Sequence, residues 1–133
     1  MTIPFELTAT DAIKLIRENK LSRYEWVQSC FERIHEKEDL VKAWIYLDED
    51  RALEKAKQLD NENNESQLGI PFGIKDIIDA SNTPTGFGTS FYQNNVPMRD
   101  AASVAVAKKS GCIFIGKTVS TELGHRAPGL TTN

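Results

Sequence analysis

The sequence has no long hydrophobic run and only two cysteines. No apolar run, Val104–Ala107 and Cys112–Ile115 included, approaches the ~20 residues that cross a bilayer, so we expect no membrane span. The N-terminal residues lack the basic segment followed by an apolar one that marks a secretory signal, and their acidic side chains argue against a transit peptide. We therefore expect a cytoplasmic protein in which Cys30 and Cys112 are free thiols.

Positive charge is also scarce. The 16 Lys and Arg residues are outnumbered by 19 Asp and Glu residues, which gives a formal net charge of -3. Without a domain-wide positive field, the chain is not expected to bind a nucleic-acid backbone. The length of 133 residues, of which 40% are hydrophobic and 26% charged, instead predicts one globular domain with a buried core.

Several motifs of common catalytic sites are absent too. The chain has no C-x-x-C, no H-E-x-x-H and only two histidines, which leaves a zinc site without enough ligands. Glu32 with His35 and Glu122 with His125 have a spacing used in di-metal helical bundles, but only the first pair falls on a credible helix, and we assign neither to a metal. The chain also lacks G-x-S-x-G and S-x-x-K nucleophile motifs.

The N-terminal third predicts helices. Thr8–Asp11 and Ser22–Glu25 both fit the capping box, in which a hydroxyl and an acid three residues later satisfy the free N–H groups of a first turn. A short strand is predicted over Ala43–Leu47, a third helix from about Asp48 to Leu59, and an exposed connection over the polar run at 60–67. Apolar residues follow the two caps at helical spacing: Ala12, Ile13 and Ile16, then Val27, Cys30, Phe31 and Ile34.

The remainder predicts a β-α-β unit. Phe72–Ile78 is the first strand, Asp100 caps the helix that follows, Gly111 provides the left-handed residue after that helix, and Cys112–Ile115 is the second strand. Parallel strands joined in this way are normally covered by helices on both faces. The long connection Asp79–Arg99 leaves the carboxyl end of a strand, where ligands bind in such sheets, and we expect it to be functional.

Lys75 is the leading candidate for chemistry. It lies within the apolar run of the first predicted strand, with Asp76 next to it on the opposite strand face. Burial disfavours the ammonium form and can lower the pKa of a lysine until the amine acts as a general base. The residues alone leave a second interpretation open, in which Lys75 lies at a strand end and its amine reaches solvent.

Taken together, several segments resemble the amidase signature family: Leu68–Asp76, Thr83–Gly86 with Gly88–Ser90, Asp100–Ala101, and Gly111–Thr118 with Glu122–Leu123. The resemblance covers roughly residues 8–133, and residues 122–133 are similar to the lead-in to the family's Gly/Ser-rich signature. It implies an α/β fold in which N-terminal helices precede a β-α-β unit of a mixed sheet covered by helices. Residues 1–133 are then the N-terminal part of an amidase signature domain, with a helical segment at 1–59, the connection at 60–67 and the start of the catalytic core at 68–133.

The resemblance also implies an activity. In that family a Ser-Ser-Lys triad hydrolyses amides; Lys75 maps onto its base, and both serines are expected beyond Asn133. No cofactor and no metal are implied. We therefore expect the N-terminal portion of an amidase that acts on the carbon-nitrogen bond of a small-molecule amide. A second hypothesis is a complete but non-catalytic remnant or partner-binding module, whose uncovered sheet edge predicts self-association or pairing with another chain.

Overall fold

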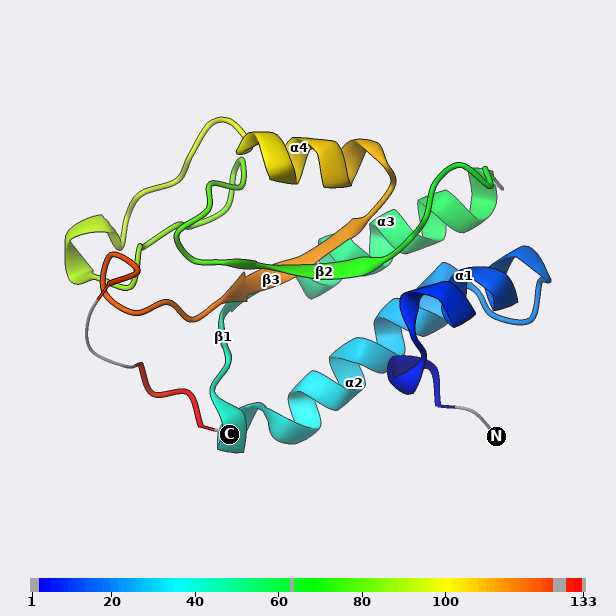
Figure 1. Ribbon diagram of the computed structural model, residues 1–133, viewed down its shortest axis with the longest axis horizontal. Helices are drawn as coiled ribbons and strands as arrows, with labels where there is room; N and C mark the ends of the chain where they lie inside the picture. Colours follow the sequence, from blue (N-terminus) through cyan, green and yellow to red (C-terminus); the bar gives the residue numbers. More distant parts are fainter. Residues whose placement is uncertain (1–2, 63, 126–128, 133) are drawn as a thin grey trace.

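A three-stranded mixed sheet forms the centre of the fold (Figure 1). The computed structural model describes residues 3–62, 64–125 and 129–132. The strands lie in the order β1-β3-β2. Strand β1 (Trp44–Leu47) is antiparallel to β3 (Ile113–Thr118), and β2 (Pro71–Lys75) is parallel to β3. The predicted strands and their parallel pairing are confirmed, although the first strand of the β-α-β unit ends three residues earlier than expected and the second ends three residues later.

Helices surround this sheet. Within the described ranges no helix is both long and apolar enough to span a bilayer. Two short 3-10 helices are also present, Pro4–Glu6 and Ser90–Tyr92. The α-helices formed by the described residues are α1 (Ala9–Arg17), α2 (Arg23–Val41), α3 (Glu49–Glu62) and α4 (Ala102–Lys109).

Side-chain caps begin the first two α-helices as predicted, but only Ser22 and Glu25 form the complete capping box; the Asp11 carboxylate accepts the Thr8 hydroxyl at 2.7 Å and not the Thr8 N–H. The Thr8 hydroxyl accepts the N–H of Asp11 at 3.1 Å. The Ser22 hydroxyl accepts the N–H of Glu25 at 3.0 Å, and the Glu25 carboxylate accepts the N–H of Ser22 at 2.8 Å. Each bond satisfies an N–H group that the first helical turn leaves free, a contribution of about 1 kcal/mol per cap.

Apolar clusters on both faces join the helices to the sheet. On one face, Phe31 of α2 and Leu59 of α3 pack with Ile115 of β3. On the other face, Ile74 of β2 packs with Val104 of α4. Figure 1 shows the same layering, with α2 and α3 on one side of the strands and α4 on the other. The two-sided cover predicted for parallel strands is confirmed.

Two helix boundaries differ from the sequence-based expectation. Asp100 does not cap α4; its carboxylate accepts the N–H of Ser81 at 2.7 Å and pairs with Lys108 at 2.8 Å, while Ala101 takes the N-cap position. The carboxylate thus joins the loop to α4. Gly111 does adopt the predicted left-handed conformation, with a φ of +77°. Helix α3 extends to Glu62, three residues beyond its predicted end, and Asp60 in this added segment has its partners at the start of α2.

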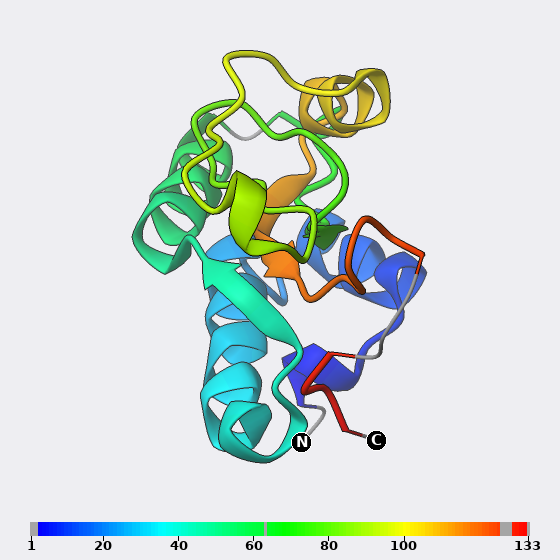
Figure 2. The same cartoon turned by 90° about the vertical axis from the view of Figure 1, so that its left-hand side faces the viewer.

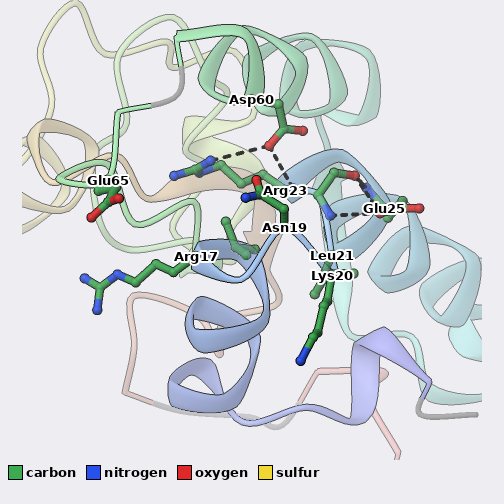
Figure 3. A pocket seen from close by; sticks show the side chains of 10 residues that line it. Arg17, Asn19, Lys20, Leu21, Arg23, Glu25, Asp60 and Glu65 are labelled. Carbon is green, nitrogen blue, oxygen red and sulfur yellow. Dashed lines mark hydrogen bonds and ion pairs between the residues drawn. The ribbon is translucent and has the colours of Figure 1, made fainter.

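Arg23, in the first turn of α2, provides those partners (Figure 3). Its guanidinium donates to the main-chain oxygens of Gln67 at 2.8 Å and Asn64 at 3.3 Å. Asp60 accepts the main-chain N–H groups of Arg23 and Tyr24 at 2.9 and 3.0 Å and pairs with the guanidinium at 3.5 Å. The predicted exposed connection is therefore helical at its start and fastened to α2 at both ends; residue 63 lies outside the described residues.

We expect Arg23→Met to lower the free energy of unfolding by about 3 kcal/mol, because the change removes the cation beside the Asp60 carboxylate and leaves two carbonyl groups without their donor. Arg17→Met is the matched control: Arg17 is exposed at the end of α1, and the loss there should stay below about 0.5 kcal/mol. Urea unfolding followed by circular dichroism measures both. Equal stability of the two variants contradicts the role assigned to Arg23.

Candidate active site

The carboxyl ends of β2 and β3 lie side by side and form the edge at which the candidate site is built. Lys75, the last residue of β2, is in register with Thr118, the last residue of β3. Residues 76–101 leave this edge after β2 and residues 119–125 leave it after β3; Figure 2 looks onto this end of the sheet. Ligands of α/β proteins commonly bind beyond such strand ends.

Lys75 is exposed, so the predicted burial of its side chain is wrong for the described part of the chain. Its apolar neighbour Ile74 points to the opposite face of the sheet, towards α4. On the face that Lys75 shares with Gly73, the ring of Trp44 lies so close that a Cβ atom at Gly73 would come within 2.6 Å of it. The strand then ends, and nothing on the described chain encloses the amine. Among the described residues Lys75 therefore lies at a strand end with its side chain exposed, and which of the two interpretations holds stays open.

Asp76 lies on the opposite face, as predicted, and is only 2% exposed. Its carboxylate accepts the N–H of Gly86 at 3.1 Å and that of Gly88 at 3.5 Å, so the loop after β2 folds back onto the strand end. Gly88 has a φ of +67°, and a Cβ atom there would lie 2.6 Å from the main-chain oxygens of Ser120 and Thr121. Only glycine fits this close approach of the two loops.

Lys117 is the charged residue that the sequence analysis did not assign. Its side chain is completely buried at the end of β3, where the amine donates to Thr85 Oγ1 at 2.8 Å and to the main-chain oxygen of Ile78 at 2.5 Å. Its Nζ lies 3.8 Å from Asp76 Oδ1. A lysine next to the end of an apolar strand, with an acid at the end of the parallel strand, was the signal that could have identified this pair.

Burial and two nearby carboxylates act in opposite directions on the pKa of Lys117. Burial lowers the pKa of Lys117, and the negative charges of Asp76 and Asp79 partly oppose this effect. One buried carboxylate oxygen of Asp79 has no hydrogen-bond partner among the described atoms. The lowered pKa that the sequence predicted for Lys75 is thus found at Lys117, whose side chain is enclosed on every side.

The other candidate residues do not join this site. Glu32 and Glu122 are exposed, and His35 contacts Glu49 at 2.7 Å instead of forming a metal pair. Among the residues that the structure describes, no three metal-binding side chains gather in one place. Both cysteines are free thiols, as expected, and burial raises the pKa of Cys30 to about 11 and also raises the pKa of Cys112. A raised pKa makes the reactive thiolate scarce.

A cavity of about 720 Å³ opens beside the same edge of the sheet. Strand β1 forms one wall through Trp44 and Tyr46, and the loop after β2 forms another through Gly86 and Thr89. Asp76 lies in its lining but Lys75 does not. The structure therefore brings Asp76, Lys117 and the predicted functional loop together next to a cavity, with Lys75 projecting from the neighbouring face.

This architecture matches solved amide hydrolases. A fatty acid amide hydrolase structure superposes with a TM-score of 0.85 at 21% identity, covering 100% of this chain and 26% of that chain. The native peptide amidase from Stenotrophomonas maltophilia superposes with a TM-score of 0.81 at 27% identity, covering 91% of this chain and 26% of that chain. The described fold is therefore the α/β fold of this class of hydrolase.

Sequence comparison gives the family. The model of the Amidase family matches residues 25–129. The chain is 34% identical over 113 residues to a glutamyl-tRNA(Gln) amidotransferase subunit from Endomicrobium trichonymphae, covering 81% of this chain and 23% of the relative. It is 33% identical over 133 residues to the corresponding protein of Fusobacterium nucleatum subsp. nucleatum, covering 96% of this chain and 27% of the relative. The chain belongs to the amidase signature family, and it spans about a quarter of the length of these relatives.

The expected fold class and family are confirmed by these matches. Residues 126–128 and 133 of the predicted lead-in to the Gly/Ser-rich signature lie outside the described residues. The catalytic role of Lys75 and the division into segments 1–59, 60–67 and 68–133 remain predictions.

The lowered pKa of Lys117 predicts a pH dependence of stability. Between the folded pKa and the unfolded value of about 10.4, the unfolded chain binds the additional proton, so the free energy of unfolding should rise with pH across that window. Lys117→Met removes the titrating group. We expect the rise to be present in the native protein and missing from this variant when urea unfolding is measured from pH 7 to 10.5. Parallel pH curves for the two proteins contradict the assignment.

Proposed function

We propose that this chain is the N-terminal part of an amidase that hydrolyses the carbon-nitrogen bond of a small-molecule amide, with Lys75 as the general base. The observation that carries the proposal is the position of Lys75: it is the last residue of β2, exposed at the carboxyl edge of a parallel strand pair, in a chain of the amidase family. A base must reach the proton that it removes, and an amine at this edge is free to do so.

The proposed chemistry is acyl transfer to a serine hydroxyl. The neutral amine of Lys75 takes the proton of a bridging serine, which in turn takes the proton of the nucleophilic serine as its oxygen attacks the amide carbon. The carbon-nitrogen bond breaks, the amine leaves with a proton, and water then releases the acid from the acyl-enzyme. Both serines belong to a part of the protein beyond residue 133, which also completes the surroundings of the Lys75 amine. No cofactor takes part.

Lys75→Ala in the complete protein should lower kcat by roughly 1000-fold, because the proton of the serine pair then has no acceptor. Lys75→Arg should not rescue the activity, since a guanidinium does not give up its proton at neutral pH. Lys109→Ala, at an exposed lysine in the last turn of α4, is the matched control and should keep native turnover. Release of ammonia or amine from a panel of amides, including benzamide and glutamine, measures all three.

Unchanged turnover in Lys75→Ala, with the fold retained by circular dichroism, would end the proposal that Lys75 is the base. Loss of turnover in the Lys109→Ala control as well would point to general destabilisation instead of a catalytic effect.

The outer edges of the sheet lead to a proposal about assembly. Both β1 and β2 pair only with β3 within the described ranges, so each presents main-chain groups on its other side that can accept a further strand. The relatives named above are subunits, which favours a partner for this protein too. We expect the intact chain mass to be several times 14.9 kDa and the native mass to exceed the chain mass.

Mass spectrometry of the denatured protein and light scattering of the native one give these two masses. A chain mass of 14.9 kDa contradicts the amidase proposal and favours the non-catalytic alternative. A native mass equal to the chain mass contradicts the proposal that this protein associates with a partner subunit.

A further inference from the structure

The carboxyl edge of the sheet holds a buried ion pair that the proposed reaction does not use. Lys117 is fully enclosed and Asp76 is 2% exposed, with 3.8 Å between Nζ and Oδ1. Both residues adjoin the strand-end pair in sequence: Asp76 follows Lys75, and Lys117 precedes Thr118, which lies in register with Lys75. Removing two charges from water is costly, and the cost is offset here only because both charges also make hydrogen bonds.

Those hydrogen bonds fix the turn that follows β2. The Lys117 amine holds the turn from one side through the main-chain oxygen of Ile78 and the hydroxyl of Thr85. The Asp76 carboxylate holds it from the other side through the N–H groups of Gly86 and Gly88. The chain directly after Lys75 therefore has its course determined by contacts with one buried pair.

Lys117 itself is not placed to act on a substrate. Its side chain has no exposed surface, and two of its three donor positions are occupied by Thr85 and Ile78, while the Asp76 carboxylate lies on the remaining side. Its contribution to a reaction has to pass through the residues that it holds.

We propose that Lys117 is a positioning residue: with Asp76 and Thr85 it fixes the end of β2, and thereby the point from which the Lys75 amine reaches the reacting atoms. This inference rests on the proposed function of Lys75. A misplacement of about 1 Å at a catalytic group can lower turnover about 100-fold without changing how the substrate binds. The expected signature is therefore a fall in kcat with KM little changed.

The test uses the complete protein and an amide that it hydrolyses. Lys117→Met should lower kcat about 100-fold with KM little changed. Thr85→Val removes one acceptor of the Lys117 amine and leaves the ion pair, and it should lower kcat about tenfold. Thr85→Ser keeps the hydroxyl and should restore most of that loss. Thr10→Val, at an exposed threonine of α1, is the matched control and should keep native turnover.

The outcomes separate this inference from the proposed function. If Lys75→Ala abolishes turnover while Lys117→Met and Thr85→Val keep native kcat, the positioning role of Lys117 is overturned and the proposal that Lys75 is the base is supported. If Lys75→Ala keeps native turnover, both are overturned. If Lys117→Met does not fold, the two Thr85 variants decide. A kcat that is low in Thr85→Val and recovers in Thr85→Ser supports the inference, and an equal loss of kcat in both variants overturns it.

Discussion

A lysine amine removed from water must find oxygen atoms in place of the solvent, and this requirement organises the carboxyl edge of the sheet. Lys117 meets it with a carbonyl, a hydroxyl and a carboxylate, all from the segment that leaves β2. The Asp76 carboxylate, which lies beside the Lys117 amine, also accepts the N–H groups of Gly86 and Gly88. The buried Lys117 charge and its partners therefore determine the path of a loop whose polar composition would otherwise leave it free. The exposed Lys75 stands at the fixed end of that arrangement.

The sequence predicted that Lys75 is both buried and able to act as a base, but the structure separates these two properties between Lys75 and Lys117. Lys75 has the access that a base needs, whereas Lys117 has the burial that lowers the pKa of an amine. Strand alternation explains the division, since adjacent positions face opposite sides and only one side is covered by the loop. The proposed role of Lys75 as a base requires a neutral amine, and the described residues leave that amine exposed.

Local patterns predicted most of the fold. Hydroxyl-acid spacing located the starts of α1 and α2, because a cap depends on residues three apart in sequence. The parallel pair and its covering helices followed from apolar runs separated by a helix. The missed features depend on residues far apart: Arg23 reaches the connection after α3, and Asp100 binds Ser81 and Lys108 instead of the N–H groups at the start of α4. No local pattern distinguishes these two side chains from solvated ones. The Lys117–Asp76 pair did leave a signal, a lysine and an acid at the ends of two parallel strands, but recognising it requires the pairing of those strands.

The cluster that unites α2, α3 and β3 also constrains how the protein is made. Phe31 and Leu59 leave the ribosome long before Ile115, which completes their packing. The first two of these elements can pair with each other as a helical hairpin, but their sheet-facing apolar side stays open until β3 has been synthesised. A nascent chain of about half this length therefore presents an unfinished hydrophobic face, the kind of surface that chaperones bind. Of the three described strands, the central one, β3, is therefore synthesised last.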